Sequence, residues 1–459
     1  MDMVSAVVWA NGEFSGAQLG DARRCNRAAR VAAGLLCNVG VAVSSSCGGS
    51  GAQAVSRFFD SDDVNEDSVL SGHKLRIGER CKHHDGRILV VQDTTALEFP
   101  GRSNIEGLGP TAVNGGNGIM MHSTFVMSEQ KLPLGVLGLR LWCRDPHERG
   151  INHTRKKRNT LEKESAKWLW GLGEVNKHLS RLGKELVLIG DRESDLYDLF
   201  ASTRPDDVHL IARISQNRVV NLDDERVKIF DALNLSPVLG EYELELEREK
   251  RTARLQVRRC RVLMSAPKGY KRINSGSVWV WVVEIREVDA PDGVECLHWR
   301  LLSSLDASSL ELCRYIAECY RARWSIEEFH RTLKTGCRVE RMQLESVSRL
   351  RPAIAMMCVV AVQVMYLTRF ARSHPDAPVY NVANKEEAET VESWVQTNRY
   401  KTYEVTTVSD YVRGIGFIGG FRGRKCDGEP GVQAIWQGLR SLANLVSGRK
   451  IERLKAART

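Results

Sequence analysis

The cysteines of this sequence are scattered, and although there are 12 of them, none forms a CxxC pair or a tight cluster. That spacing excludes zinc fingers and related metal-binding modules. The opening residues, Met1-Asp-Met-Val, lack a basic region and a following apolar stretch, so we expect no secretory signal peptide. Reduced thiols in a cytoplasm are the simplest account of the cysteines.

The chain has few long hydrophobic runs. The longest apolar run, Pro352–Leu367, falls just short of the usual length of a membrane span and contains Gln363. We therefore expect a buried core helix in this place. We find no internal repeat and no low-complexity tract along the chain.

The excess of positive charge is small. The chain has 66 Lys and Arg residues against 57 Asp and Glu residues, a formal net charge of +9 over 459 residues. Such an excess permits nucleic-acid binding but does not demonstrate it. The content of 42% hydrophobic and 27% charged residues is ordinary for a soluble globular protein. The length predicts roughly two to four domains.

The order of the sequence patterns predicts an α/β fold with helical segments at both ends. Residues 1–75 and most residues after Arg351 have helical patterns. A helix is also expected at Leu161–Leu182. Short apolar runs predict buried strands at residues 88–93, 118–127, 134–142, 185–191 and 208–213. Alternating patterns predict antiparallel strands at residues 242–247, 253–258 and 278–286, within a β-rich insertion over about residues 214–305.

One predicted helix, at roughly residues 308–336, carries four side chains of chemical interest on one stripe. Tyr320, Arg323, Glu327 and Lys334 stand at offsets 0, 3, 7 and 14, which an α-helix brings to within roughly 60° of one another. The apolar residues of the same segment cluster on a different face, which can pack against a core. The alternative is a solvated helix with ion pairs between neighbouring turns.

Two predicted strands end in an aspartate, Asp93 and Asp191. Ligands bind outside the carboxyl ends of strands in open α/β sheets, so these side chains could meet if their strands are neighbours. Together with Glu327 they would form a set of three carboxylates, which favours Mg²⁺ or Mn²⁺. Two such ions can clamp the attacking and leaving oxygens of a phosphoryl transfer, while Arg323 and Lys334 hold phosphates. The alternatives are a turn at Asp93, and an ion pair or a helix cap at Asp191.

Six segments of the chain closely resemble the DDE transposases of bacterial insertion sequences, of the transposon-five type. The segment Tyr320–Gly336 carries the tyrosine–arginine–glutamate–lysine signature of that family at Tyr320, Arg323, Glu327 and Lys334. The other five segments are Asp93–Thr95, Gly190–Tyr197, Leu19–Arg24, Glu162–Trp168 and Ala434–Leu439. The resemblance spans nearly the whole chain.

The resemblance implies an RNase H-like mixed sheet with a β-rich insertion, flanked by helical domains. The implied domains are a transposon-end DNA-binding domain at 1–75, a catalytic domain at 80–345, and a dimerisation domain at 346–459. The implied metal-binding triad is Asp93, Asp191 and Glu327, with two ions of Mg²⁺ or Mn²⁺. The implied partners are double-stranded DNA, as transposon ends and target, and a second copy of the chain in a homodimer. The implied location is the bacterial cytoplasm, in association with the nucleoid.

The same resemblance assigns DNA contacts to further residues. Trp299 matches the tryptophan on which the family stacks a flipped base during hairpin formation. Stacking on this ring recovers the free energy that is lost when the base leaves the DNA stack. Tyr320 and Arg323 would hold the phosphate beside that base. The further implied DNA contacts are Lys334, Arg213, Arg24 and Arg27. For Trp299 the alternative is a strand core residue, which is what we expect of Trp279 and Trp281; for Arg24 and Arg27 it is an exposed arginine-rich helix.

Three functions are consistent with these patterns. The first is an active cut-and-paste transposase, which cleaves transposon ends, forms hairpins and transfers strands. The second is a protein that binds transposon ends but does not cut, such as a decayed or domesticated copy. A stand-alone RNase H-like nuclease fits less well, because it does not explain the flanking helical segments.

Overall fold

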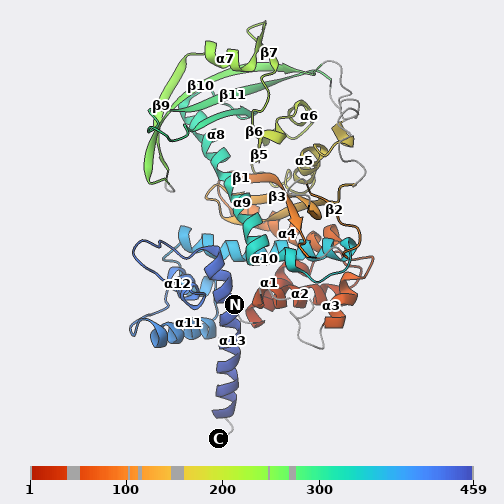
Figure 1. Ribbon diagram of the computed structural model, residues 1–459, viewed down its shortest axis with the longest axis vertical. Helices are drawn as coiled ribbons and strands as arrows, with labels where there is room; N and C mark the ends of the chain where they lie inside the picture. The colour runs from red at the N-terminus through yellow and green to blue at the C-terminus, as the bar shows by residue number, and fades with distance from the viewer. Residues whose placement is uncertain are drawn as a thin grey trace. The chain divides into compact units, whose positions relative to one another are not determined.

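The computed structural model describes residues 3–38, 52–101, 104–111, 116–145, 160–246, 249–267 and 275–456. The chain folds into two compact units, each built from separate segments (Figure 1). The first unit takes Met1–His84, Thr94–His147 and Glu327–Thr459. The second unit takes Asp85–Asp93 and Glu148–Ile326. Strand β1 (Ile88–Glu98) and helix α9 (Trp324–Arg331) each contribute residues to both units.

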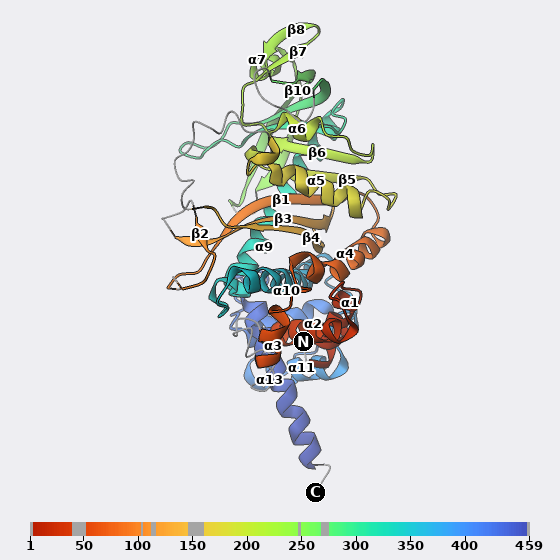
Figure 2. The same ribbon diagram turned by 90° about the vertical axis from the view of Figure 1, so that its right-hand side faces the viewer.

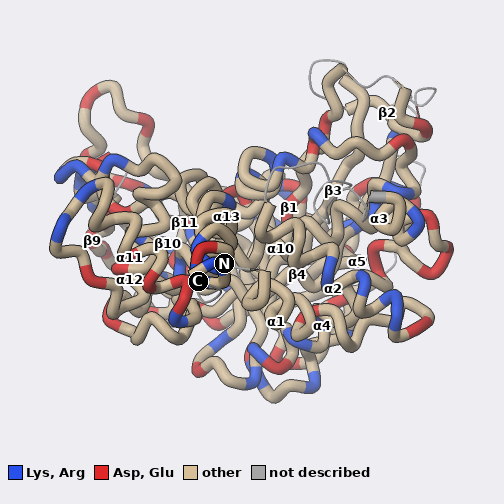
Figure 3. The backbone as a smooth tube through the Cα atoms, turned by 90° about the horizontal axis from the view of Figure 1, so that it is seen from below, with Lys and Arg blue, Asp and Glu red and all other residues tan. Residues whose placement is uncertain are grey.

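The first unit is mostly helical. Its N-terminal helices are α1 (Met3–Phe14), α2 (Ala22–Cys37), α3 (Ala52–Phe59) and α4 (Glu66–His83). Its strands are β2 (Gly109–Pro110), β3 (Asn117–Ser128) and β4 (Pro133–Trp142). Its later helices are the π-helical turn η6 (Thr332–Gly336), η7 (Val339–Arg341), α10 (Val347–Ser373), η8 (Val379–Asn381), α11 (Lys385–Asn398), α12 (Val408–Ile418) and α13 (Val432–Ala456). Basic and acidic residues are interspersed along these helices (Figure 3).

Strands β3 and β4 form an antiparallel hairpin, as their two apolar runs predict. Helices α4 and α10 pack against β4 (Figure 2). Helix α4 begins with a capping box, in which Asn65 and Ser68 satisfy each other's backbone N–H groups. Its first turn carries Glu66 and Asp67, whose charges suit the positive end of the helix dipole.

Helix α10 contains the longest apolar run of the sequence. It is the one helix among the described residues that is long and apolar enough to cross a membrane, and 83% of its most apolar window is buried. A mostly buried helix of this kind is weak evidence for a membrane span. The expected core helix is therefore present, because its apolar side chains pack inside the first unit.

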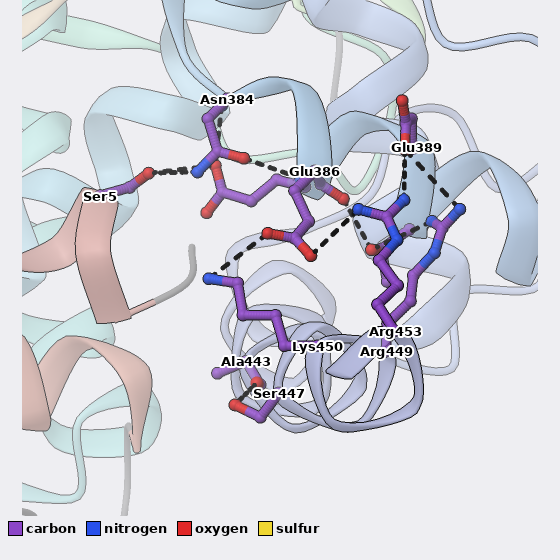
Figure 4. Close-up of polar contacts among 11 residues, drawn as sticks. Ser5, Asn384, Glu386, Glu389, Ala443, Ser447, Arg449, Lys450 and Arg453 are labelled. Carbon is purple, nitrogen blue, oxygen red and sulfur yellow. Dashed lines mark hydrogen bonds and ion pairs between the residues drawn. The ribbon is translucent and has the colours of Figure 1, made fainter. Parts of the chain in front are cut away.

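The C-terminal helices of the first unit are joined by ion pairs (Figure 4). Glu386 and Glu389 of α11 face the basic residues of α13: Lys450 lies 3.4 Å from Glu386, and Arg453 lies 3.1 Å from Glu389. Arg449 adds a longer ion pair, 3.7 Å from Glu389. The C-terminal half of α13 extends away from the other helices of this unit in both ribbon views (Figures 1 and 2).

The second unit is a mixed α/β structure. Its helices are η4 (Thr160–Glu162), α5 (Ala166–His178), η5 (Arg192–Ser194), α6 (Tyr197–Phe200), α7 (Ile229–Leu235) and α8 (Leu310–Ala322). Its strands, besides the start of β1, are β5 (Leu186–Gly190), β6 (Val208–Arg213), β7 (Val219–Leu222), β8 (Glu225–Lys228), β9 (Val238–Leu246), β10 (Arg251–Ser265), β11 (Ser277–Val288) and β12 (His298–Ser303). The helix expected at Leu161–Leu182 is divided into η4 and α5, with a break at residues 163–165.

The sheet of this unit changes from parallel to antiparallel at β6. Strands β1, β5 and β6 are parallel neighbours with fully apolar central residues, as expected of buried strands. Strand β12 then pairs with β6 antiparallel, and β11 and β10 follow in order. Strands β9 and β7 both pair with β10, and β8 pairs with β7. The antiparallel part corresponds to the predicted β-rich insertion.

The expectation that Trp279 is a strand core residue is wrong. Its side chain is 53% exposed. Trp281 is half-buried. The reason is the face on which Trp279 lies: α7 packs against the opposite face of β10 and β11, whereas Val283 and Ile285, farther along the same face as Trp279, are fully buried.

Candidate active site

Asp93 and Asp191 stand at matching positions of two neighbouring parallel strands. The register of β1 on β5 pairs Val90 with Leu188 and Val91 with Ile189. The same register, continued by two residues, places Asp93 opposite Asp191. Adjacent strands are about 4.8 Å apart, so the two residues lie side by side where β5 ends. The expectation that both aspartates end their strands is correct for Asp191 and wrong for Asp93, because β1 continues to Glu98.

Asp191 also caps the short helix η5. Its side chain accepts a hydrogen bond from the backbone N–H of Glu193 at 2.8 Å, and its backbone oxygen accepts one from the hydroxyl of Ser194 at 2.7 Å. The capping alternative therefore describes its local structure. A carboxylate has two oxygens, so a cap does not prevent a second role.

Burial raises the pKa of Asp191 above its usual value. The negative charge of Glu193 acts in the same direction, while the hydrogen bond from the Glu193 N–H and the cations Arg323 and Lys167 act against it. Lys167 is buried and lies 2.8 Å from Glu193. Removal from water therefore raises the free energy of the ionised form of Asp191. A bound cation would lower it.

Lys167 and Glu193 are neighbours of the site that no sequence pattern singles out. Each lies inside a segment that resembles the family, Glu162–Trp168 and Gly190–Tyr197. Their identity as a pair depends on α5 packing near the end of β5, which no spacing in the sequence reveals.

The signature segment is helical but not one continuous α-helix, which corrects the expected helix at 308–336. Helix α8 ends at Ala322, Arg323 is its C-cap, and α9 begins at Trp324. From Thr332 to Gly336 the turn is π-helical. The ideal angle of 100° per residue therefore does not hold along the whole stripe. Its apolar side is confirmed, because Ala322, Ile326, Phe329 and Leu333 are all buried.

Within the second unit, Arg323 connects the signature segment to the pair of aspartates. Its guanidinium lies 3.6 Å from a carboxylate oxygen of Asp93 and over the ring of Tyr320, 6.0 Å from the ring centre. Tyr320 is buried and meets the ring of Trp299 edge to face, with the centres 5.7 Å apart at 66°. Asp93, Arg323, Tyr320 and Trp299 thus form a chain of contacts.

Arg213 lies on the same sheet as Trp299. It ends β6, and its guanidinium donates to the backbone oxygen of His298 at 3.1 Å. The register pairs Arg213 with Leu301, two residues from Trp299 on β12. Since side chains two residues apart share a face, Arg213 and Trp299 lie on one face of the sheet.

Glu327 and Lys334 belong to the first unit. Glu327 is half-buried in the first turn of α9. Lys334 lies in the π-helical turn, 31% exposed, with its ammonium 3.9 Å from Glu340. Glu340 in turn accepts a hydrogen bond from the backbone N–H of Glu98 at 2.9 Å. The ion pair of Lys334 is therefore long and accessible to solvent.

The two N-terminal arginines differ from each other. Arg24 lies 2.7 Å from Asp63 and donates to the backbone oxygen of Leu19 at 3.1 Å, so its charge is used within the first unit. Arg27 is exposed on α2. Asp21 caps that helix by accepting from the Arg24 N–H at 2.7 Å.

The paired aspartates fit a hard divalent cation, because carboxylate oxygens are its preferred ligands and the register sets two of them side by side. No three side chains of His, Cys, Asp or Glu form a metal-binding group within the part of the chain that the structure describes. The observed fit concerns Asp93 and Asp191 alone.

Comparison with known families finds three matches along the chain. A family model described as Transposase DNA-binding matches residues 7–64, which span α1 to α3. One described as Transposase DDE domain matches residues 171–362, and one described as Transposase Tn5 dimerisation domain matches residues 359–458. The chain belongs to the Tn5-type DDE transposases.

The matches confirm the family expected from the signature segment. They also support DNA as a partner, formation of a dimer, and a nuclease or transferase that uses divalent metal ions. The predicted fold class is confirmed as a mixed α/β transposase with helices at both ends. The DDE match covers Asp191 and Glu327, whereas Asp93 precedes it. The three-domain boundaries at 75–80 and 345–346 stay a prediction.

Proposed function

We propose that this transposase carries out cut-and-paste transposition: it binds transposon ends, cleaves them, forms hairpins and transfers the freed strands to a target. The observation that carries the proposal is the pair Asp93 and Asp191, which the register of β1 on β5 sets opposite each other at the point where β5 ends. The family signature beside them supplies Arg323, which contacts Asp93.

In this proposal Asp93, Asp191 and Glu327 hold two divalent ions, Mg²⁺ or Mn²⁺. Such ions, when bound, activate the attacking oxygen and stabilise the leaving oxygen of a phosphoryl transfer. The chain itself supplies position and charge, which account for most of this kind of catalysis. Arg323 is already oriented by Tyr320 and Asp93, so its guanidinium can take a DNA phosphate with little loss of conformational freedom.

Trp299 would receive the flipped base during hairpin formation. Its ring is half-buried and contacts the ring of Tyr320, which orients it before DNA binds. Stacking of a base on an aromatic ring contributes about 1–3 kcal/mol, comparable to the cost of unstacking the base. Tyr320 and Arg323 would hold the adjacent phosphate, and Arg213 would contact DNA from the same face of the sheet.

Recognition of the transposon ends is assigned to Arg24 and Arg27, and backbone contact to Lys334. Arginines on a helix can pair with guanine in the major groove. Arg27 is exposed for such a contact, while Arg24 would have to exchange Asp63 for DNA. A homodimer would bring two ends together, in the bacterial cytoplasm at the nucleoid.

The test is cleavage of DNA that carries the cognate end, in the presence of Mg²⁺. We expect the wild-type transposase to nick the end and Glu327→Ala to bind it without nicking, because the variant lacks a metal ligand while its DNA contacts remain. Glu318→Ala is the matched control, because Glu318 is an exposed glutamate of α8 that forms an ion pair with its neighbour Arg321. It should cut normally.

Two other results would change the conclusion. Binding without nicking by the wild type would favour an end-binding protein that does not cut. Cutting that ignores the end sequence would favour a simple nuclease.

A further inference from the structure

The face of the sheet that carries Trp299 continues well beyond it. Gly240, Val257, Ile285 and Trp299 lie opposite one another across β9, β10, β11 and β12. Helix α8 lies over this row, since Leu310 at its start is 2.9 Å from the position of a Cβ at Gly240, and Tyr320 near its end contacts Trp299. We call this side of the sheet the α8 face.

The next row of the α8 face is covered by the connection into α8. It contains Arg259, Val283, Leu301 and Arg213. Val283 and Leu301 are fully buried, and Arg259 donates to the backbone oxygen of Ser308 at 3.1 Å. Helix α7 lies on the other side of the same strands, where the backbone oxygen of its C-cap Ser236 accepts from Arg258 (Figure 1).

Beyond that row the α8 face opens to solvent and carries stacked arginines and tryptophans. Arg261 lies over the ring of Trp279, and Arg259 lies over the ring of Trp281, each 5.2 Å from the ring centre. Trp279 is 53% exposed, and Arg261 is exposed beside it. A stack of this kind at an exposed site contributes only about 0.5–1 kcal/mol, which does not offset the exposure of so large an apolar ring.

The hairpin β7–β8 extends the open surface with more positive charge. Asn221 pairs with Leu263 on one side and with Arg226 on the other, so Arg226 lies on the α8 face. Lys228, two residues along β8, lies on the same face. Both are exposed. Arg226, Lys228, Arg261 and Trp279 form what we call the open basic patch.

The acidic residues near these paired rows lie outside them. None of the residues of these paired rows is acidic. Asp223 and Asp224 lie in the β7–β8 turn, and Glu225 pairs with Leu222 on the opposite face. Asp306, in the connection before α8, is exposed and bonded to Ser308. The patch covers four strands, β11, β10, β7 and β8, which is about 14 Å across.

We propose that the open basic patch binds the phosphate backbone of double-stranded DNA, as an extension of the surface that carries Trp299 and Arg213. Charge complementarity selects a polyanion, and DNA is the polyanion that this family binds. The exposed arginine over Trp279 provides a planar donor for a phosphate while the indole covers the sugar beside it. The proposal rests on DNA as partner and not on any catalytic step.

The experiment measures the affinity of the full-length transposase for a DNA duplex of arbitrary sequence, over a series of salt concentrations. In Arg226→Gln/Arg261→Gln we expect the slope of log affinity against log salt to fall by about 1.8, because each phosphate that is no longer neutralised reduces it by about 0.9. Arg286→Gln is the matched control, because Arg286 is exposed on β11 but lies on the opposite face. It should keep the wild-type slope.

The contribution of Trp279 to DNA binding can be tested separately. Trp279→Ala should weaken duplex binding several-fold without changing the salt slope, and Trp279→Phe should recover most of the affinity. A role in sheet stability alone would lower the melting temperature and leave DNA binding unchanged.

Three outcomes would overturn the proposal. One is an unchanged slope in the double arginine variant, and another is an equal reduction in Arg286→Gln. The third is tighter binding of a single strand that depends more strongly on Trp279, which would assign the patch to unpaired bases. If Trp279→Ala does not fold, the arginine variants decide the question, because both positions are exposed and glutamine retains most of the side chain.

Discussion

The ring of Trp299 contacts that of Tyr320 on one side and is open to solvent over part of its surface. We expect Trp299→Ala to retain the first nick and to lose hairpin formation, because the first cut needs no flipped base whereas the hairpin does. Denaturing gels of end-labelled DNA separate the nicked product from the hairpin. Trp299→Phe keeps a stacking ring and should form hairpins at a reduced rate. A normal hairpin yield from Trp299→Ala would remove Trp299 from this role.

Lys334 offers a second test at the level of one side chain. It is 31% exposed, and its ion pair with Glu340 is long, at 3.9 Å. A phosphate contact made by Lys334 releases about one counterion, so Lys334→Ala should weaken end binding and reduce the salt slope by about 0.9. Lys385→Ala is the control, because Lys385 is 81% exposed on α11. Equal slopes for wild type and Lys334→Ala would exclude a phosphate contact at this position.

At the level of elements, the signature segment shows which features of a helix the periodicity of the sequence can predict and which it cannot. The alternation of apolar and charged residues correctly predicts a helical segment and its buried side, which includes Ile326 and Phe329. It does not predict the break at Arg323, where the backbone N–H groups of Arg323 and Ile326 bond to oxygens three residues back and not four. The π-helical turn after Arg331 is equally invisible to a fixed angle per residue.

A buried charge network joins three elements of the first unit. Glu13 of α1 accepts from His73 of α4 and pairs with Arg80 of the same helix. The backbone N–H of Val136, on β4, donates to the Nε2 atom of His73 at 3.1 Å, so the Nδ1 atom carries the proton that His73 shares with Glu13. Because Glu13 lies inside the segment that matches the DNA-binding family, this network fastens that segment to α4 and β4.

This network predicts a dependence of stability on pH. Burial alone would raise the pKa of Glu13, but the interactions with His73 and Arg80 outweigh it and lower the pKa to about 2 from an ordinary value of 4.5. The lowered pKa means that Glu13 stabilises the fold above about pH 4.5, and that this contribution, roughly 3 kcal/mol, disappears as the pH falls toward 2.

Glu13→Gln isolates that contribution, because it keeps the shape and removes the charge. The variant should melt well below the wild type at neutral pH, and the difference should shrink steadily as the pH falls below about 4.5. Thermal melts of both proteins over a pH series give the comparison. A difference that stays constant down to low pH would show that the charge of Glu13 does not contribute in this way.

For the molecule as a whole, the sequence predicts those structural features that depend on the residues of one short segment. Asp191 could be placed at a strand end because it follows an apolar run. Asp93 follows a similar run, but β1 continues past it to Glu98, and the structure adds the parallel register that sets the two aspartates side by side. The exposure of Trp279 could not be predicted, because it depends on where α8 and the connection before it cover the sheet. Apolar strands look alike whether or not a distant segment covers them.

The last helix of the transposase, α13, carries exposed apolar residues near its C-terminal end. Ile451 and Leu454, near the end of α13, are 55% and 62% exposed. They lie inside the match to the Tn5 dimerisation domain. On the same helix Arg449, Lys450 and Arg453 pair with α11 of the same chain (Figure 4), which orients α13 while Ile451 and Leu454 stay exposed.

We therefore expect Ile451→Asp/Leu454→Asp to weaken the dimer and leave the fold intact. Burial of two such side chains contributes about 3 kcal/mol or more, so the dimer dissociation constant should rise by about a hundredfold. Sedimentation equilibrium measures that constant directly. Leu75→Asp is the control, because Leu75 is 62% exposed on α4, outside the matched dimerisation region, and should leave the dimer unchanged. If the double variant dimerises as well as the wild type, another surface of the match makes the interface, because charges at these two positions could not be buried without a large cost.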